Sequence, residues 1–197
     1  SVLQVTPKKG RADKIGGSGG IGPMTSRFSL EGPIGEKTTF ILGSRLTYSD
    51  WLLDFLSDKI DLGASRAAFS DFNGTVEHEL GAKDKIRLSG YYSKDSFQFD
   101  PDTVYSYSNQ NVALSWTHYF SDALEATFSV GQDGYNFEVQ GEDNPLNSYQ
   151  YRFDIRQQFF KAQFRQEKGD RHVLNYGVHG IRYQLNPGEI LPFGAES

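Results

Sequence analysis

Apolar and polar residues alternate one for one along much of this 197-residue chain. The stretch from residue 123 to 138 is a clear example, with apolar side chains at every second position: Leu124, Ala126, Phe128 and Val130. A period of two is that of a β-strand with one apolar face, because successive side chains point to opposite sides. The pattern predicts an all-β fold of about nine strands, at residues 14–22, 25–34, 37–49, 66–80, 84–99, 104–120, 123–138, 147–166 and 171–184.

The alternation changes phase within one of these strands. Its apolar positions are odd at first and even later: Tyr149, Tyr151, Phe153 and Ile155, followed by Phe160, Ala162 and Phe164. The change falls near Gln157 and Gln158. We interpret it as a β-bulge, which inserts one extra residue into a strand and so reverses the faces of all that follow.

The predicted strands are long, and several exceed the ~9–11 residues that a tilted strand needs to cross a bilayer. Short polar turns are predicted at residues 35–37, 81–84, 121–122 and 167–170. Long connections are predicted between them, at residues 49–65, 94–102, 132–146 and from 184 onward. Alternating short and long connections are typical of an up-and-down barrel in an outer membrane. A Greek-key sandwich gives no reason for such regularity.

Composition narrows the classes of protein further. A mean hydropathy of −0.54, without a run of about 20 apolar residues, excludes a helical membrane protein. A barrel strand needs only every second residue to be apolar, so its mean hydropathy stays low. The formal net charge of −5 argues against a nucleic-acid partner, which would call for a basic surface.

Aromatic residues gather near predicted strand ends, among them Tyr48, Trp51 and Trp116. Such rings suit the headgroup level of a membrane, where an apolar body and a polar tip are both satisfied. They would also suit an ordinary sheet core, and both interpretations stay open. The stretch 51–56 breaks the alternation, and two interpretations stay open for it: a helical turn in an outer loop, or a hydrophobic cluster of that loop.

The candidate ligand contacts are Tyr105, Tyr107, Asn109 and Asn111, which share one face of a predicted strand. Tyrosine and asparagine in this arrangement would stack on and hydrogen-bond a sugar or a chelate; a merely polar lumen wall is the alternative. The chain has no G-x-S-x-G elbow, no phosphate loop and no paired histidines at metal-ligand spacing. We therefore expect neither an enzyme nor a bound metal or cofactor.

Four stretches, at residues 1–10, 19–34, 40–48 and 185–189, resemble TonB-dependent receptors of the outer membrane, of the Bacteroidota type. The resemblance implies that residues 1–13 are the last plug strand and its linker, and that residues 14–197 are part of a barrel of about 22 strands. We expect the rest of the plug, the TonB box and the remaining strands to lie outside this chain. Residues 185–189 would belong to an outer loop.

The resemblance also implies a function. Such a receptor takes up a scarce nutrient by energy-coupled transport: an iron chelate, a vitamin, an oligosaccharide or a peptide. Its partners would be outer-membrane lipid, the TonB complex and that substrate. Two alternatives remain from the sequence: a small outer-membrane barrel with an adhesive or structural role, and a soluble all-β module that binds glycans. A barrel lipase or protease is a more distant alternative, because no catalytic set is recognisable.

Overall fold

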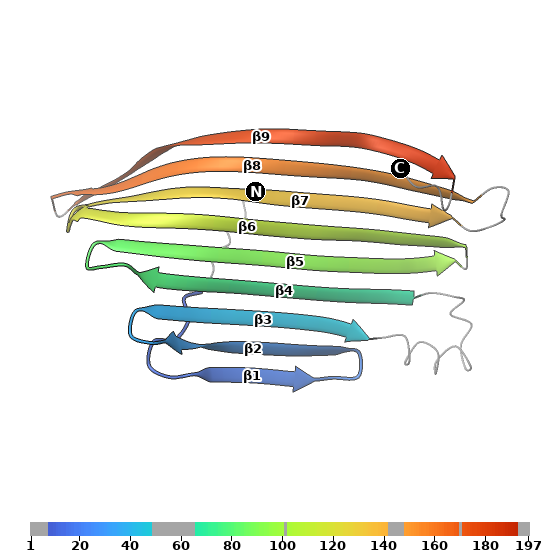
Figure 1. The fold of residues 1–197 in the computed structure, drawn as a ribbon, viewed down its shortest axis with the longest axis horizontal. Helices are drawn as coiled ribbons and strands as arrows, with labels where there is room; N and C mark the ends of the chain where they lie inside the picture. The colour runs from blue at the N-terminus through green and yellow to red at the C-terminus, as the bar shows by residue number, and fades with distance from the viewer. Residues whose placement is uncertain (1–7, 49–65, 101, 142–147, 170, 193–197) are drawn as a thin grey trace.

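The computed structural model describes residues 8–48, 66–100, 102–141, 148–169 and 171–192. These residues form nine strands: β1 Gly16–Ile21, β2 Thr25–Ile34, β3 Thr38–Tyr48, β4 Arg66–Glu79, β5 Asp84–Asp100, β6 Thr103–Ser121, β7 Leu124–Gly141, β8 Tyr149–Lys168 and β9 His172–Pro192. Each strand pairs antiparallel with the next in a single sheet, in the order of the chain (Figure 1). The prediction of an all-β, up-and-down meander of nine strands is confirmed.

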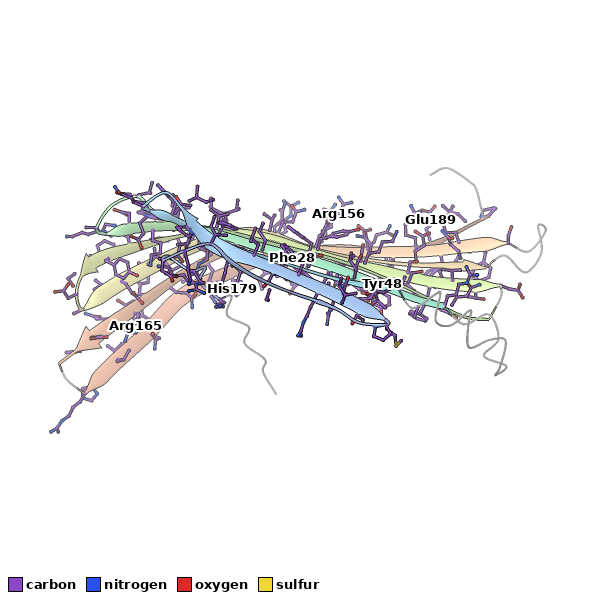
Figure 2. All side chains as sticks on the ribbon, turned by 90° about the horizontal axis from the view of Figure 1, so that it is seen from below. Phe28, Tyr48, Arg156, Arg165, His179 and Glu189 are labelled. Atoms are coloured by element: carbon purple, nitrogen blue, oxygen red, sulfur yellow. The ribbon has the colours of Figure 1, made fainter. Side chains whose placement is uncertain are left out.

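The sheet is one twisted layer with side chains on both faces (Figure 2). Among the described residues only three apolar side chains are buried, those of Ala126, Val139 and Ala162. A soluble chain of this length would bury a far larger apolar core. No helix in the described ranges is long and apolar enough to span a membrane.

The two faces of the sheet follow directly from the strand register. We define face A as the face that carries Leu114 and face B as the face that carries Asn111. One row across face A consists of directly paired residues from β5 to β8: Leu88, Leu114, Val130 and Phe160. These four side chains are 49, 46, 49 and 47% exposed, so nothing in the described chain covers them.

The row belongs to an apolar belt on face A, in the half of the sheet nearest the short turns. The belt also includes exposed residues of β2, β4, β6 and β9: Ile34, Val76, Val112, Trp116, Phe120, Tyr176 and Val178. In β2 to β4 the apolar surface of face A continues farther from the short turns, with Phe28, Leu46 and Phe72. In β6 it extends over nine residues, from Val112 to Phe120. Exposed apolar patches of this extent are rare on soluble monomers and mark a surface that contacts lipid or another protein.

A row of rings crosses four strands within the belt. Trp116 of β6 stacks on Phe128 of β7 with 5.5 Å between ring centroids. Phe128 meets Phe164 of β8 at 6.0 Å, and Phe164 stacks on Tyr176 of β9 at 5.3 Å. The Trp116 Nε1 donates a hydrogen bond to Asp84 Oδ1 at 2.9 Å. At the two ends of this row, Trp116 and Tyr176 each combine an apolar ring with a polar tip.

Beyond the belt, toward the opposite end of the strands, the polarity of the two faces is reversed. Face A now carries polar residues: Lys94, Ser106, Ser108, Asn136, Arg152 and Asp154. Face B carries apolar and aromatic residues instead: Phe97, Tyr105, Tyr107, Phe137, Phe153 and Ile155. The reversal runs across β5 to β8 at the level where the belt ends.

This reversal corrects the predicted bulge at Gln157 and Gln158. Both residues pair in unbroken register with β7 on one side and with β9 on the other. The phase of the alternation changes because the environment of each face changes along an uninterrupted strand. A register shift does occur between β8 and β9, but it lies at Arg152/Asp154.

The reversal also explains two connections that were predicted too long. Residues 94–100 and 132–141 belong to β5 and β7, so strand replaces most of both predicted loops. The predicted strict alternation of short and long connections is therefore wrong, since only residues 101–102 join β5 to β6. Likewise β9 continues through residues 185–189, which were expected in an outer loop. The predicted long connection 49–65, with its helical turn at 51–56, lies outside the described residues.

Candidate ligand-binding surface

The four predicted contact residues lie in a row on face B of β6. Tyr105, Tyr107, Asn109 and Asn111 are all half-buried, and they alternate with residues of face A. They lie in the half of β6 beyond the belt, which ends at Val112. The structure therefore brings all four to one surface, with the two amides nearer the belt and the two tyrosines farther from it.

The two amides lie in a hollow of about 420 Å³ on face B. Asn111 Nδ2 donates a hydrogen bond to Asp133 Oδ1 at 2.5 Å, and Gln157 Nε2 donates to Asp133 Oδ2 at 3.1 Å. Asn109 Nδ2 donates to Ser93 Oγ at 3.3 Å. The lining is completed by residues of four neighbouring strands, β5 to β8: Tyr91, Gln110, Gly134, Tyr135 and Ile155. Asp133 therefore holds two amide side chains in fixed orientations around one carboxylate.

The two tyrosines belong to an aromatic shelf beyond the hollow. Phe97 of β5 stacks on Tyr105 with 5.0 Å between centroids and 7° between planes, and its edge meets Tyr107 at 6.0 Å. A second group surrounds Phe153 of β8, whose ring lies 5.1 Å from Phe137 of β7. Rings packed edge and face in this way are held rigidly, so they offer a preformed apolar surface.

Sequence reasoning missed the partners that complete this surface, notably Asp133, Phe137, Phe153 and Gln157. Their alternation was visible, but odd positions of residues 149–155 were interpreted as a continuation of the apolar face. The signal that identifies them is the phase change itself. Once an unbroken strand is assumed, the odd aromatic positions must share a face with Tyr105 and Tyr107.

On face B of β4 to β9, the described Lys and Arg side chains lie at the level of the belt and not beyond it. Beyond the belt the face carries the carboxylates of Asp71, Asp95 and Asp133. Arg45 of β3 forms an ion pair with Asp71 at 2.8 Å and lies over the Phe69 ring at 4.5 Å from its centroid. On face B of β4 to β9, no described Lys or Arg lies on that side of Asn111. The charged side chains around the hollow on face B are therefore carboxylates.

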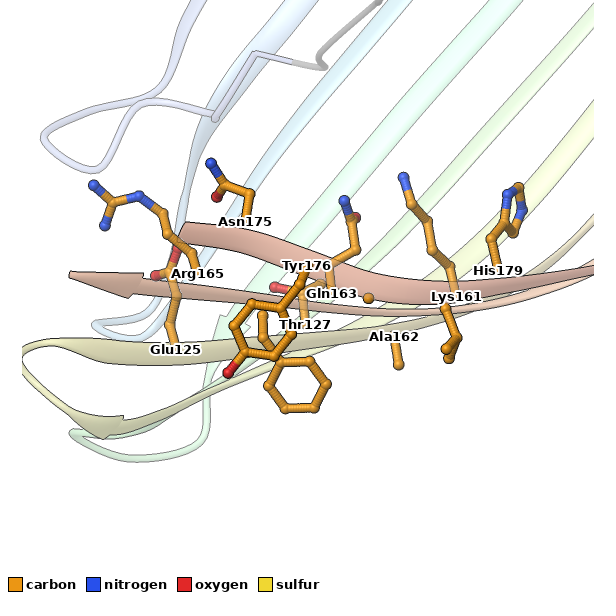
Figure 3. Close-up of a pocket in the computed structure, with 12 residues that line it drawn as sticks. Glu125, Thr127, Lys161, Ala162, Gln163, Arg165, Asn175, Tyr176 and His179 are labelled. Atoms are coloured by element: carbon orange, nitrogen blue, oxygen red, sulfur yellow. The ribbon is translucent and has the colours of Figure 1, made fainter. Parts of the chain in front are cut away.

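A second hollow, of about 500 Å³, lies at the short-turn end of β7 to β9 (Figure 3). Lys161, Gln163 and Arg165 point to one side of β8, whereas Ala162 points to the other (Figure 3). The residues that line this hollow thus come from both faces of the sheet, around β8 and β9. A space that straddles the open edge of a sheet has no enclosed wall, so we do not regard it as a candidate site.

The segment before β1 crosses face B near the short turns (Figure 1). Lys8 Nζ contacts Glu31 Oε1 of β2 at 3.0 Å, and Lys9 Nζ contacts Glu77 Oε1 of β4 at 3.2 Å. A Cβ atom at Gly10 would lie 2.2 Å from the Phe40 carbonyl oxygen, so only glycine lets the segment approach β3 this closely. Face B is therefore the face that receives another part of the chain.

Glu77 is the centre of a charge cluster beneath this segment. Its side chain is 4% exposed and lies near three cations, Lys9, Lys85 and Arg87. Arg87 donates to Glu77 Oε2 through both Nε and an Nη atom.

In the segment itself, the hydrogen bond from Arg11 lowers the pKa of the exposed Asp13 to about 2, so this carboxylate is charged at neutral pH.

Two of the four histidines have hydrogen-bond partners in strands. His78 Nδ1 lies 2.8 Å from Thr38 Oγ1, and His118 Nδ1 lies 2.8 Å from Asp84 Oδ1. Within the described ranges, no three His, Asp or Glu side chains come together in a group that could hold a metal ion.

Comparison with models of protein families, with curated proteins and with solved structures gives no match for this chain.

Proposed function

We propose that this sheet is an arc of a larger outer-membrane β-barrel, with face A toward lipid and face B toward the lumen. The exposed apolar belt is the observation that carries the proposal. Nine strand residues tilted by roughly 40° rise about 23 Å, close to the ~25 Å apolar band of such barrels. The row of rings from Trp116 to Tyr176 lies on the same face, within the belt.

The edges of the sheet support a larger barrel. In the described part of the chain, no strand pairs with the outer edge of β1 or of β9. Unpaired backbone groups are costly in a bilayer, where water does not replace the missing partner. Further strands that close the barrel, to the expected total of about 22, would remove both edges.

Within such a barrel we propose a TonB-dependent receptor that imports a scarce nutrient by energy-coupled transport. The segment 8–15 supports this function, because it lies on the proposed lumen face and is joined to the wall by ion pairs of Lys8 and Lys9. A plug domain inside the lumen would leave toward β1 along this path. The proposal includes a TonB box ahead of that plug, through which TonB would supply the energy for uptake.

Membrane fractionation of the intact protein tests the barrel part of the proposal. The protein should sediment with the outer membrane and migrate faster on gels before heating than after, as closed barrels do. Recovery in the soluble fraction would contradict it.

For the transport part of the proposal, deleting the gene for this protein and deleting TonB should each abolish uptake of the same nutrient from a defined medium. Uptake that persists without TonB would contradict energy coupling.

A further inference from the structure

We infer that the hollow around Asn111 and Asp133, with the aromatic shelf beyond it, binds a neutral oligosaccharide. This inference rests on the proposed barrel and names the class of its substrate. Asn111 directly follows the level at which the belt ends, so the hollow would open into the lumen just outside the membrane. A ligand arriving from the cell exterior would meet the shelf first and the hollow next.

The hydrogen-bonding groups of the hollow suit sugar hydroxyls. Asn109, Asn111 and Gln157 each use one side-chain N–H in the bonds to Ser93 and Asp133. Each amide then has a carbonyl oxygen and a second N–H for a ligand, since an amide carries two donors and one acceptor oxygen. A hydroxyl both donates and accepts, so a polyhydroxylated ligand can use both kinds of group.

The rings supply the second half of sugar recognition. Tyr91 is 39% exposed at the edge of the hollow, and Tyr135 lines it from β7. Tyr107 continues the same face along β6. The C–H face of a sugar ring is apolar and packs on an aromatic face, while the phenolic hydroxyl remains available at the ring edge.

Charge selects a neutral ligand over an anionic one. Asp133 lies in the hollow and Asp95 lies farther along face B of β5. The described cations of face B on this side lie on β2 and β3, away from the hollow on β5 to β8: Arg27, and Arg45, which is already paired with Asp71. A ligand rich in carboxylate or phosphate would be repelled here and would lack a cation to receive it.

The test is binding of the intact protein, purified in detergent, to an oligosaccharide array. The array holds neutral hexasaccharides of glucose, xylose, mannose and galactose, with an oligogalacturonate as the anionic counterpart. We expect binding to at least one neutral sugar and none to the oligogalacturonate. Asn111→Ala and Tyr91→Ala should each weaken that binding about tenfold, the loss expected for one good contact.

Ser115→Ala serves as the matched control, since Ser115 lies on face B of the same strand but bonds Ser129 within the belt region. It should leave sugar binding unchanged. Heat-modifiable migration confirms that each variant is folded. A folded protein that binds no neutral sugar, or binds the oligogalacturonate alone, would overturn the inference while the barrel proposal stands. Binding that survives both substitutions at full strength would overturn it as well. Failure to reach the outer membrane would instead count against the barrel.

Discussion

Leu114→Arg in the intact protein is expected to leave little folded protein in the outer membrane. Leu114 lies within the belt on face A, two residues inside its end at Val112, pairs with Leu88 and Val130 in the register, and is 46% exposed. A guanidinium on the lipid face at mid-bilayer costs roughly 2–4 kcal/mol. The measurement is the fraction of protein in the outer membrane that migrates faster before heating than after.

Thr127→Arg is the matched control for this prediction. Thr127 lies on face B at the level of the belt, bonds Thr117 at 3.0 Å, and has Glu125 on the same face two residues away. An added cation there would meet water and a carboxylate instead of lipid. We expect at least half of the wild-type amount. Equal loss with both variants would contradict the assignment of face A to lipid.

Glu77→Ala is expected to destabilise the folded protein by about 2 kcal/mol. The substitution leaves Lys9, Lys85 and Arg87 clustered without their common carboxylate. Breaking a fully buried ion pair costs roughly 3–5 kcal/mol, and the loss here is smaller because the cations are partly exposed. The free energy of unfolding, from denaturant titration in detergent, measures the change.

Glu79→Ala provides the comparison from the same strand. Glu79 is 51% exposed and contacts Lys9 at 3.7 Å, so its loss should cost about 0.5 kcal/mol or less. If Glu79→Ala destabilised the protein as much as Glu77→Ala, the cluster would not be centred on the buried carboxylate. An unchanged stability for Glu77→Ala would show that the segment 8–15 does not depend on this cluster.

The strands of the fold were predictable because alternation is a local property. Strand β2 was predicted at its observed bounds, residues 25–34, since Phe28 and Leu30 share a face of uniform environment along the whole strand. The outer parts of β5 and β7 were harder to predict. There the apolar residues change face, so residues such as Asn136 and Phe137 of β7 do not continue the alternation that the inner part of the strand begins.

The candidate surface was predictable only in part for the same reason. Tyr105, Tyr107, Asn109 and Asn111 lie on one strand, so their shared face follows from parity alone. Asp133 and Gln157 lie on two other strands, and their position opposite Asn111 depends on the register. Register is set by turn lengths and by pairing along whole strands. Where the connections were predicted too long, the sequence pattern specified neither of these.

The central claim is that face A meets lipid over the belt and water beyond it. Spin labels attached to single cysteines test this directly, because the chain contains no cysteine of its own. Labels would replace Val112, Leu114 and Trp116 in the belt and Ser106, Ser108 and Gln110 beyond it, in the intact protein reconstituted in lipid vesicles. The account predicts that molecular oxygen, which concentrates in lipid, relaxes the three belt labels most strongly. A water-soluble nickel chelate should relax the other three. Belt labels that respond to the chelate as strongly as the outer labels would contradict the account.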